Sequence, residues 1–582
     1  MQKHNLLIVV CLLIFLSSCN WIEQYQTYSR FRDKISANDS IFLERKNHYS
    51  FLPNEFNETS RLYYIAKVWG FLKYYHENTN QNIVDVDLVL IDAINKSKTC
   101  HSKTEFQSIL ANIISSIQIS DLQNHSPFPE NQDYMLIDNN WMNDTIVLSP
   151  TISKQLNEIF LKHSGKENPF IEQSGIGRIR LLNETNYPHE FPDENLRLLG
   201  LFRYWNIINY FFVYKNFMDE NWDNVLYESI PIFKDIHSEE TYHWEIARLT
   251  NKLGDGHANM PTLNDSIVFG NNIPNFNITK IQDTFLIREI MVPEKNIENF
   301  QVGDILLEIN NQSINFLYDS LKHFVGSGSY WAQQRSVNSL MLSDYQPTTR
   351  LKLLRNGKDT LTLTAKNTYW EELTQLWTLN DKKEKQYQWI NDSIAYIDTR
   401  YLTSANFNKN YKPIKKAKAI IIDLRCYPDN FIMAKMIDAF VPPSTSFAIV
   451  TYPDIRFPGM VRYHRQNIKM GSKNYFQGHT ILLVNELTGS FSEYLTMALQ
   501  QNPRTITVGR STAGSNGNIV RMKFPGEIES WHSGVGIYYP DFTPTQRTGI
   551  KIDYIVEPDV TSVSKNIDVA LEKAKDLAKN GR

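Results

Sequence analysis

A serine follows a glycine turn at the end of a strongly apolar stretch in the last third of the chain. Residues 480–484 (TILLV) are typical of a buried strand, and Gly489 supplies a sharp turn just before Ser490. We expect Ser490 to open a helix, with its hydroxyl beside the unpaired N–H groups of the first helical turn. Such amides favour the negative charge that develops on an attacked carbonyl oxygen, which makes Ser490 a candidate nucleophile.

The same residues also fit a purely structural interpretation. Ser490 and Glu493 form the Ser-x-x-Glu pattern of a capping box, in which the serine caps the helix and the glutamate binds back to the N-terminal amide. Taken alone, this pattern favours the cap over the nucleophile.

A histidine that could act as a base lies far upstream of this serine. A helical pattern over residues 242–253 ends in Gly254-Asp255-Gly256-His257, and glycines at such an end are typical of a helix C-cap and a tight turn. We expect His257 on a constrained turn, where an imidazole can accept a proton near neutral pH. A plain surface or core histidine is the alternative, and Asp255 could cap the turn.

The elements that must position Ser490 alternate between strands and helices. Apolar runs of buried-strand type occupy residues 395–397, 419–424 and 480–484. Helical patterns follow two of these runs, at residues 431–440 and 490–501. This alternation predicts a C-terminal α/β domain over residues 388–582.

A smaller β-rich domain is expected over residues 275–367. Residues 285–287 and 302–310 predict strands, and the Asn356-Gly357 pair within residues 351–363 predicts a hairpin. The run GDILLEINN at residues 303–311 resembles a PDZ domain, which would bind an extended peptide along a sheet edge. A generic β-sandwich fragment is the alternative.

An internal repeat indicates a helical region over residues 56–265. The repeated residues lie 136 positions apart and are Arg61 and Arg197, Leu62 and Leu198, Trp69 and Trp205, Tyr74 and Tyr210, Asp87 and Asp223, and Leu90 and Leu226. Apolar residues recur at helical spacing in both copies, so we predict two related helical units with an aromatic core.

The N-terminus carries a targeting signal. Residues 1–19 combine Lys3, an apolar run too short to span a bilayer, and the sequence Leu16-Ser17-Ser18-Cys19, which resembles a lipobox. We therefore expect a lipoprotein signal peptide, lipidation of Cys19, a linker over residues 20–55 and no transmembrane helix. The protein would lie in the cell envelope, anchored to the outer membrane and facing the periplasm or the cell surface.

Composition excludes several other classes of protein. The chain has 582 residues and a net charge of −3, and it has no basic stripe of the kind that binds nucleic acid. Only Cys100 and Cys426 follow the signal peptide, so a single disulfide is possible and a four-cysteine zinc site is not. Residues 509–517 are rich in glycine but lack Gly-Lys-Ser/Thr, and there is no HExxH or CxxC motif, so we predict no cofactor and no metal.

Taken together, these motifs resemble the C-terminal processing and tricorn-like serine peptidases. The matching segments are residues 422–425 (IDLR), the Ser-x-x-Glu after its strand, residues 508–517, residues 538–541 (YYPD) and residues 546–550. The resemblance implies a multidomain α+β protein: a helical N-terminal region, a PDZ-like β domain and a crotonase-like (ClpP-like) peptidase domain. It also implies Ser490 as the nucleophile.

The base is carried over less directly. Processing peptidases place a lysine in the glycine-rich segment after the serine, where this sequence has Ser515. Tricorn-like members use an upstream histidine, and residues 253–257 resemble that segment, so the resemblance implies His257 as the general base. Asp553 is the expected orienting acid, with Glu493 as its alternative.

One departure concerns the oxyanion hole. The family often has Asn-Pro-Gly-Gly after the Asp-Leu-Arg strand, whereas residues 426–430 here read CYPDN. We expect the backbone amides of Phe491 and Asp429 to serve as the two donors, although positive φ is strained outside glycine.

These features predict a serine-type endopeptidase that cleaves envelope proteins or peptides through an acyl-enzyme on Ser490. Its partners would be a protein or peptide substrate and, through the lipid anchor, a membrane. The alternatives are a catalytically inactive lipoprotein that binds peptide or lipid on the same scaffold, and a scaffold whose helical repeat binds a partner protein. Oligomeric state is not predicted.

Overall fold

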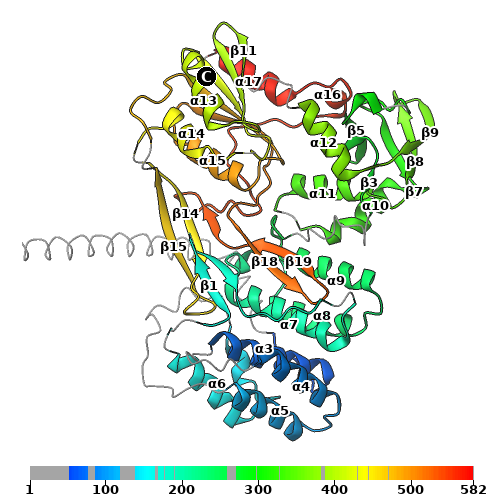
Figure 1. The fold of residues 1–582 in the computed structure, drawn as a ribbon, viewed down its shortest axis with the longest axis vertical. Coiled ribbons are helices and arrows are strands. Elements are labelled where there is room, and N and C mark those ends of the chain that lie inside the picture. The colour runs from blue at the N-terminus through cyan, green and yellow to red at the C-terminus, as the bar shows by residue number, and fades with distance from the viewer. Residues whose placement is uncertain are drawn as a thin grey trace, which may run out of the picture.

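The computed structural model is a multidomain α+β protein with helices at one end and an α/β part at the other (Figure 1). It describes residues 51–580 except for positions 76–84, 118–137, 164, 166–167, 176, 189–190, 259–269, 296–297, 327, 382–386, 429, 444 and 469–470. The predicted signal peptide with Cys19, and residues 20–50 of the predicted linker, lie outside the described residues. In the described segments, no helix has the length and apolar character needed to cross a bilayer.

The helical end contains α3 to α9. These helices are α3 (Glu58–Tyr75), α4 (Val86–Lys98), α5 (Lys103–Ser116), α6 (Pro150–Lys162), α7 (Glu194–Phe211), α8 (Trp222–Lys234) and α9 (Glu239–Asn251). Helices α3 and α7 are buried on nearly all sides, which explains why neither sequence shows a polar face. A short hairpin of β1 (Ile171–Ser174) and β2 (Arg178–Leu181) precedes α7.

The two sequence copies of this region pack against each other and exchange ion pairs. Lys67 on α3 binds Asp223 on α8 at 2.7 Å, and the equivalent Arg203 on α7 binds Asp87 on α4. Each buried cation therefore finds its carboxylate in the other copy. Because breaking one such pair would leave a buried charge, these contacts hold the copies in a single arrangement.

Residues 276–366 form an antiparallel sheet with two helices. Its strands, in the order β4-β5-β6-β8-β9, are β4 (Phe276–Ile281), β5 (Thr284–Ile290), β6 (Ile305–Ile309), β8 (Thr348–Arg355) and β9 (Asp359–Lys366). Strand β7 (Gln312–Ser313) pairs with β6. Asn356 and Gly357 both have positive φ, at 54° and 69°, as the predicted hairpin requires. We call this sheet, with α10 (Ile314–Leu321) and α11 (Tyr330–Leu342), the β module.

A short β10 (Thr368–Tyr369) pairs with β3 (Asn272–Ile273) at the base of the β module. Helix α12 (Trp370–Asp381) then leads toward the C-terminal part.

A six-stranded sheet forms the centre of the C-terminal part. Its strands, in spatial order, are β11 (Tyr387–Asn391), β12 (Ile394–Asp398), β13 (Ala419–Asp423), β16 (His479–Val484), β17 (Thr505–Gly509) and β21 (Tyr554–Ile555). All are parallel except β11, which is antiparallel at one edge. The strands predicted at residues 395–397, 419–424 and 480–484 are therefore confirmed.

Helices cover both faces of this sheet. One apolar core lies under α13 (Ser404–Ile414), α14 (Met433–Phe440) and α15 (Phe491–Leu499), and a second lies under α17 (Val569–Asn580). Helix α16 (Val560–Ser564) precedes α17. In such a sheet, functional groups gather at the carboxyl ends of the parallel strands, where β13 and β16 end here.

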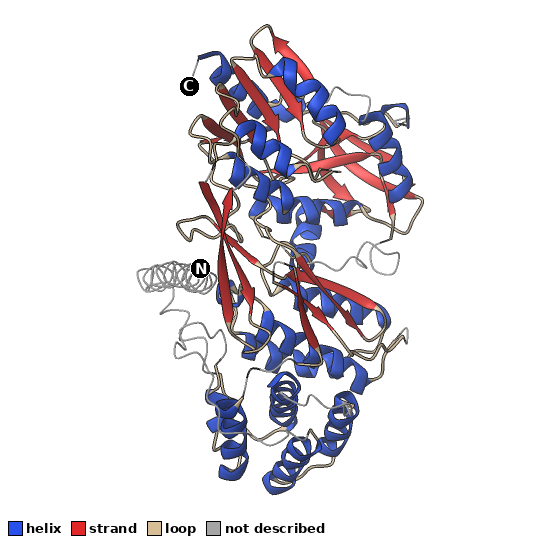
Figure 2. Ribbon diagram, turned by 60° about the vertical axis from the view of Figure 1, so that its left-hand side comes forward, coloured by secondary structure: helices blue, strands red, loops and turns tan. Residues whose placement is uncertain are grey.

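Strands outside the six-stranded sheet connect the α/β part with the helical end, and Figure 2 shows them between the two. They are β14 (Thr445–Pro453), β15 (Val461–Ile468), β18 (Ile519–Phe524), β19 (Ile528–Ser533) and β20 (Gly536–Tyr538). Val520, Met522 and Phe524 of β18 join the apolar core of the helices. The possible disulfide does not form, because Cys100 and Cys426 are both free and buried.

Candidate active site

Ser490 lies at the sharp turn between β16 and α15, and it does not cap the helix. Its backbone has φ 50° and ψ −113°, a combination that residues other than glycine rarely adopt. Its hydroxyl makes no hydrogen bond that caps the helix. The hydroxyl instead donates to the carbonyl oxygen of Gly517 at 3.2 Å. Strain of this kind is typical of a serine held out of a strand-to-helix turn for attack.

Glu493 retains one half of the capping box, since the Ser490 backbone amide is among the donors that act on its carboxylate. Its carboxylate is fully buried and accepts hydrogen bonds from Thr512 Oγ1 at 2.6 Å, from Gly514 N at 2.8 Å and from Ser515 N at 3.1 Å. Burial raises the pKa of Glu493 to about 7, although these donors act in the opposite direction. Glu493 therefore ties the glycine-rich segment to the helix that begins just after Ser490.

Ser515 lies between two turns, which we call the nucleophile turn (Gly489 and Ser490) and the histidine turn (residues 254–257). Its carbonyl oxygen accepts the Ser490 amide at 2.8 Å. A Cβ on Gly489 would lie 3.7 Å from Ser515 Oγ, and a Cβ on Gly256 would lie 2.4 Å from Ser515 Cβ. Both turns thus pack against this one residue, and the Gly256 contact leaves no room for a side chain.

The His257 imidazole is held by a chain of two further side chains. Its Nδ1 lies 2.9 Å from Ser533 Oγ, and Ser533 Oγ donates to Asp255 Oδ1 at 2.8 Å. A hydroxyl has only one hydrogen to donate, so Ser533 must accept the Nδ1–H of His257. This arrangement fixes the tautomer and leaves Nε2 with a lone pair, as a general base requires.

Asp255 is the buried end of this chain. Its carboxylate also accepts from the backbone amides of Ser533 at 2.6 Å and His257 at 3.1 Å, and from Gln546 Nε2 at 3.0 Å. Burial lowers the pKa of His257, and the charge of Asp255 partly opposes this effect. His257 is therefore neutral near pH 7, in the form that can take a proton.

Ser490 and His257 share a neighbourhood without a direct hydrogen bond. Both turns contact Ser515, yet the Ser490 hydroxyl bonds to Gly517. Rotation of one serine side chain would release that bond, and contacts between nucleophile and base often tighten only in the complex with substrate.

The structure describes one of the two expected oxyanion donors. Phe491 is the first residue of α15, and within the described residues its amide has no hydrogen-bond acceptor. Asp429 lies outside the described residues. The segment before it is nevertheless fixed to the nucleophile turn, because Ser492 Oγ donates to Cys426 O at 2.7 Å and Thr488 Oγ1 donates to Leu424 O at 2.8 Å.

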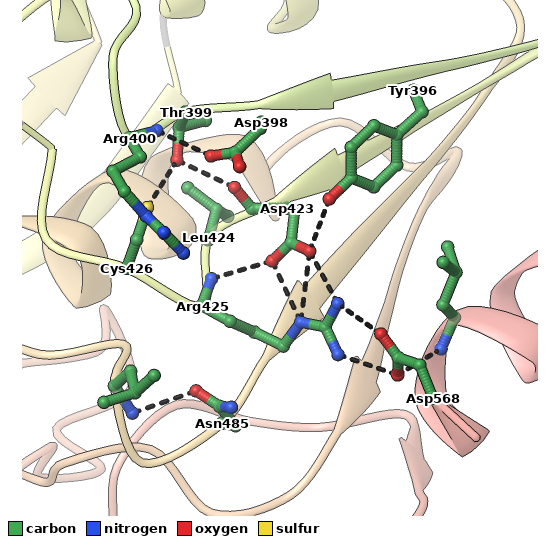
Figure 3. Close-up of polar contacts among 12 residues, drawn as sticks. Tyr396, Asp398, Thr399, Arg400, Asp423, Leu424, Arg425, Cys426, Asn485 and Asp568 are labelled. Carbon is green, nitrogen blue, oxygen red and sulfur yellow. Dashed lines mark hydrogen bonds and ion pairs between the residues drawn. The ribbon is translucent and has the colours of Figure 1, made fainter. Parts of the chain in front are cut away.

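An ion-pair network anchors the start of this segment at the end of β13. Figure 3 shows Arg425 between two carboxylates: Arg425 Nη2 lies 2.6 Å from Asp423 and 2.7 Å from Asp568. Tyr396 OH donates to Asp423 at 2.8 Å, and Thr399 Oγ1 donates to the Asp423 carbonyl at 2.7 Å. The Asp-Leu-Arg strand thus has a structural role at the base of the segment that leads to position 429.

The sequence around this site matches a known family of enzymes. Residues 393–562, which include Ser490 and Ser533, match the sequence model of peptidase family S41. The C-terminal part of the chain is a domain of peptidase family S41. It is therefore a serine-type peptidase, a hydrolase.

Solved structures agree with this assignment at the level of the fold. Mature CPAF complexed with lactacystin is 11% identical, with a TM-score of 0.52 over 66% of this chain and 98% of that chain. Mature CPAF itself is 12% identical, with a TM-score of 0.52 over 66% of this chain and 97% of that chain.

A putative peptidase from Parabacteroides merdae is also 12% identical, over 67% of this chain and 97% of that chain, with a TM-score of 0.41. No curated protein matches the chain.

Asp553 does not take the orienting position expected of it in this S41 site. Its carboxylate accepts the Thr507 amide at 2.8 Å, and its own amide donates to Thr507 O at 3.0 Å. These contacts join the residue to β17, whereas the contact of His257 Nδ1 is with Ser533. The prediction that Asp553 orients His257 is therefore corrected: Asp553 binds the backbone of β17 near the edge of the sheet.

Sequence reasoning missed Ser533 altogether. It lies 276 residues from His257, at the end of a β-hairpin with no motif around it. The only local signal was Asp255, two positions before the histidine in the same tight turn. The described residues contain no group of three or more histidine, cysteine or acidic side chains placed to hold a metal ion.

Proposed function

We propose that this S41 peptidase is an endopeptidase that cleaves peptide bonds through an acyl-enzyme on Ser490. The observation that carries the proposal is the chain from His257 through Ser533 to Asp255, which presents imidazole Nε2 as a base in the turn packed beside the nucleophile turn. Ser490 is only partly buried, so a peptide carbonyl can reach its hydroxyl.

In the proposed reaction, Ser490 Oγ attacks the peptide carbonyl carbon while His257 Nε2 takes the hydroxyl proton. The carbonyl oxygen becomes an oxyanion, and the Phe491 amide at the positive end of α15 donates to it. His257 then gives its proton to the leaving amine as the C–N bond breaks. A water molecule, deprotonated by the same imidazole, hydrolyses the ester and restores Ser490.

Asp255 stabilises the imidazolium that forms during each step. Its charge acts through the Ser533 hydroxyl, which stays hydrogen-bonded to both groups. We propose the order Ser490, His257, Ser533, Asp255 for the catalytic chain, with Asp429 as a second amide donor.

We propose that the β module is a PDZ-like domain that holds an extended segment of the substrate. Its antiparallel sheet and two helices fit that role. A cavity of about 700 Å³ lies beside the β module and is lined by Arg248 of α9, Tyr330 of the β module and Arg547 of the C-terminal part.

We propose further that lipidated Cys19 anchors the enzyme in the cell envelope, where the substrates would be envelope proteins or peptides. The motif that supports this is residues 16–19. Incorporation of a radiolabelled fatty acid into the wild type but not into Cys19→Ala tests the anchor. Equal incorporation in both would refute it.

Labelling with a fluorophosphonate tests the proposed nucleophile. The wild type is expected to form one covalent adduct, Ser490→Ala none, and His257→Ala an adduct at a rate lower by a factor of roughly 10² or more. Ser492→Ala, which alters the next serine in the chain, is a control for the site of attachment. Equal labelling of wild type and Ser490→Ala would refute the proposal.

A binding protein without catalysis is the second candidate. It is favoured by the bond from Ser490 Oγ to Gly517 O, and by CYPDN in place of a glycine pair at residues 426–430. A protein that binds peptide or lipid, yet shows no turnover that depends on Ser490, would support this alternative.

A further inference from the structure

Three aromatic rings form an edge-to-face cluster directly beside the nucleophile. Phe431 and Phe491 have ring centroids 4.6 Å apart at an interplanar angle of 77°, and Tyr427 and Phe431 lie 6.3 Å apart at 86°. Phe491 is the residue after Ser490, so its Cα lies about 3.8 Å from that of the nucleophile. We call Tyr427, Phe431 and Phe491 the aromatic cluster.

The aromatic cluster is exposed to solvent, which is unusual for such large apolar side chains. Phe431 is 66% exposed and Tyr427 is 54% exposed, whereas Phe491 is half-buried. A partner that covers exposed aromatic surface removes it from water, and this burial has a favourable free energy. In the described residues the cluster packs on itself and leaves one side open.

The two exposed residues each have a buried neighbour in the chain. Cys426 and Ile432, which flank them, are buried, and the Cys426 carbonyl accepts the Ser492 hydroxyl at 2.7 Å. Ile432 begins the packing of α14 under the sheet. Tyr427 and Phe431 are therefore each joined to a residue that buried contacts hold.

From this geometry, and resting on the proposed endopeptidase function, we infer that the aromatic cluster binds an apolar side chain of the substrate next to the scissile bond. An extended peptide advances about 3.3 Å per residue, so a residue that flanks the attacked carbonyl lies within reach of rings this close to Ser490. A large aromatic or branched aliphatic side chain would cover Phe431, whereas an acidic one would lose hydration without gaining a partner. The substrate class is thus peptides with a bulky apolar residue at that position.

The first test reads the preference directly. The wild type is incubated with a proteome-derived peptide library, and the cleavage products are identified by mass spectrometry. We expect Phe, Tyr, Leu and Met to be enriched at one position flanking the cut, and Asp and Glu to be depleted there. An even distribution at both flanking positions would overturn the inference.

The second test assigns the preference to Phe431. Two quenched fluorescent peptides are compared that differ only at the flanking position, with Phe in one and Ala in the other. Phe431→Ala is expected to lower the ratio of their kcat/KM values roughly 10-fold, mainly through KM, and Phe431→Leu to restore most of the ratio. The control is Leu161→Ala, since Leu161 is 58% exposed on α6, at the helical end of the molecule.

A ratio that Phe431→Ala leaves unchanged would overturn the inference. If that variant instead lowers the mass of the protein in sedimentation, the cluster covers a contact between copies of the chain, and the inference is wrong for that reason.

Binding measured without catalysis separates this inference from the proposed function. In a Ser490→Ala background, the Phe peptide labelled with fluorescein is expected to bind more tightly than the Ala peptide, and Phe431→Ala to abolish the difference. If Ser490→Ala retains full hydrolysis, the proposed nucleophile is wrong, while the anisotropy difference still decides the role of Phe431.

Discussion

Ser533 accepts the Nδ1–H of His257 across 2.9 Å, because its own hydrogen is committed to Asp255. The imidazole proposed as the general base is therefore oriented by a serine rather than by a direct carboxylate. Ser533 is a positioning residue, since it acts on the reacting atoms only through the imidazole.

Ser533→Ala is expected to lower kcat roughly 10²-fold, because the imidazole loses the contact that selects its tautomer. KM for a short peptide should change much less. Steady-state kinetics with a quenched peptide measure both parameters. Ser530→Ala, in the same strand and equally buried, is the matched control, and a similar loss of kcat in that variant would point to a general effect of packing.

Asp255→Asn is expected to lower kcat and to move the acid limb of the pH profile to lower pH. The Asp255 charge raises the pKa of His257 against the effect of burial, so removal of the charge lowers that pKa further. The imidazole then stays deprotonated down to a lower pH. Profiles of kcat/KM against pH for the variant and the wild type test the direction.

The control for that profile is Asp219→Asn, which removes the exposed carboxylate that pairs with Arg547. An acid limb that moves to higher pH in Asp255→Asn would contradict the assignment of Asp255.

Glu493 is expected to make the protein less stable as pH rises from about 4.5 to 7. Burial raises its folded pKa from 4.5 to about 7, so the folded state binds the proton more tightly than the unfolded state. The associated stability, about 3 kcal/mol, is fully present below pH 4.5 and is lost as pH rises through 7.

Glu493→Gln should therefore reduce the difference in unfolding free energy between pH 4.5 and pH 8 by about 3 kcal/mol relative to the wild type. Urea denaturation at the two pH values measures it. The exposed Glu572→Gln on α17 is the control, and an unchanged difference in Glu493→Gln would show that this carboxyl is not responsible.

Arg425→Met is expected to destabilise the protein by roughly 3 kcal/mol, because it leaves the largely buried Asp423 carboxylate without its cation. Asp568→Asn should cost no more than about 1 kcal/mol, since Asp568 is 40% exposed. Urea denaturation of both variants gives the order. Equal losses would mean that the network does not anchor the end of β13 as described.

Local patterns predicted the elements around Ser490 well. The apolar runs became β12, β13 and β16, and the helical pattern after Gly489 became α15. The turn that carries His257 was also predicted, because glycines just after a helical pattern indicate where the helix ends. Each of these predictions depends on neighbours within a few residues.

Contacts between distant segments were the part that local patterns could not supply. Nothing near Ser533 distinguishes it from other serines, and only the folded chain brings it to His257. Asp553 was chosen by its position relative to family motifs, yet its carboxylate binds the Thr507 amide. The strained backbone of Ser490, which excludes a simple cap, likewise follows from packing around Ser515 rather than from its sequence.

A crystal structure of the enzyme after reaction with a peptidyl phosphonate would test the central claim most directly. The account predicts phosphorus bonded to Ser490 Oγ, with a phosphonate oxygen accepting the Phe491 amide and His257 Nε2 within about 2.6–3.2 Å of Ser490 Oγ or the leaving-group position. A phosphonate attached to another residue, or an imidazole that stays turned away from the adduct, would contradict it.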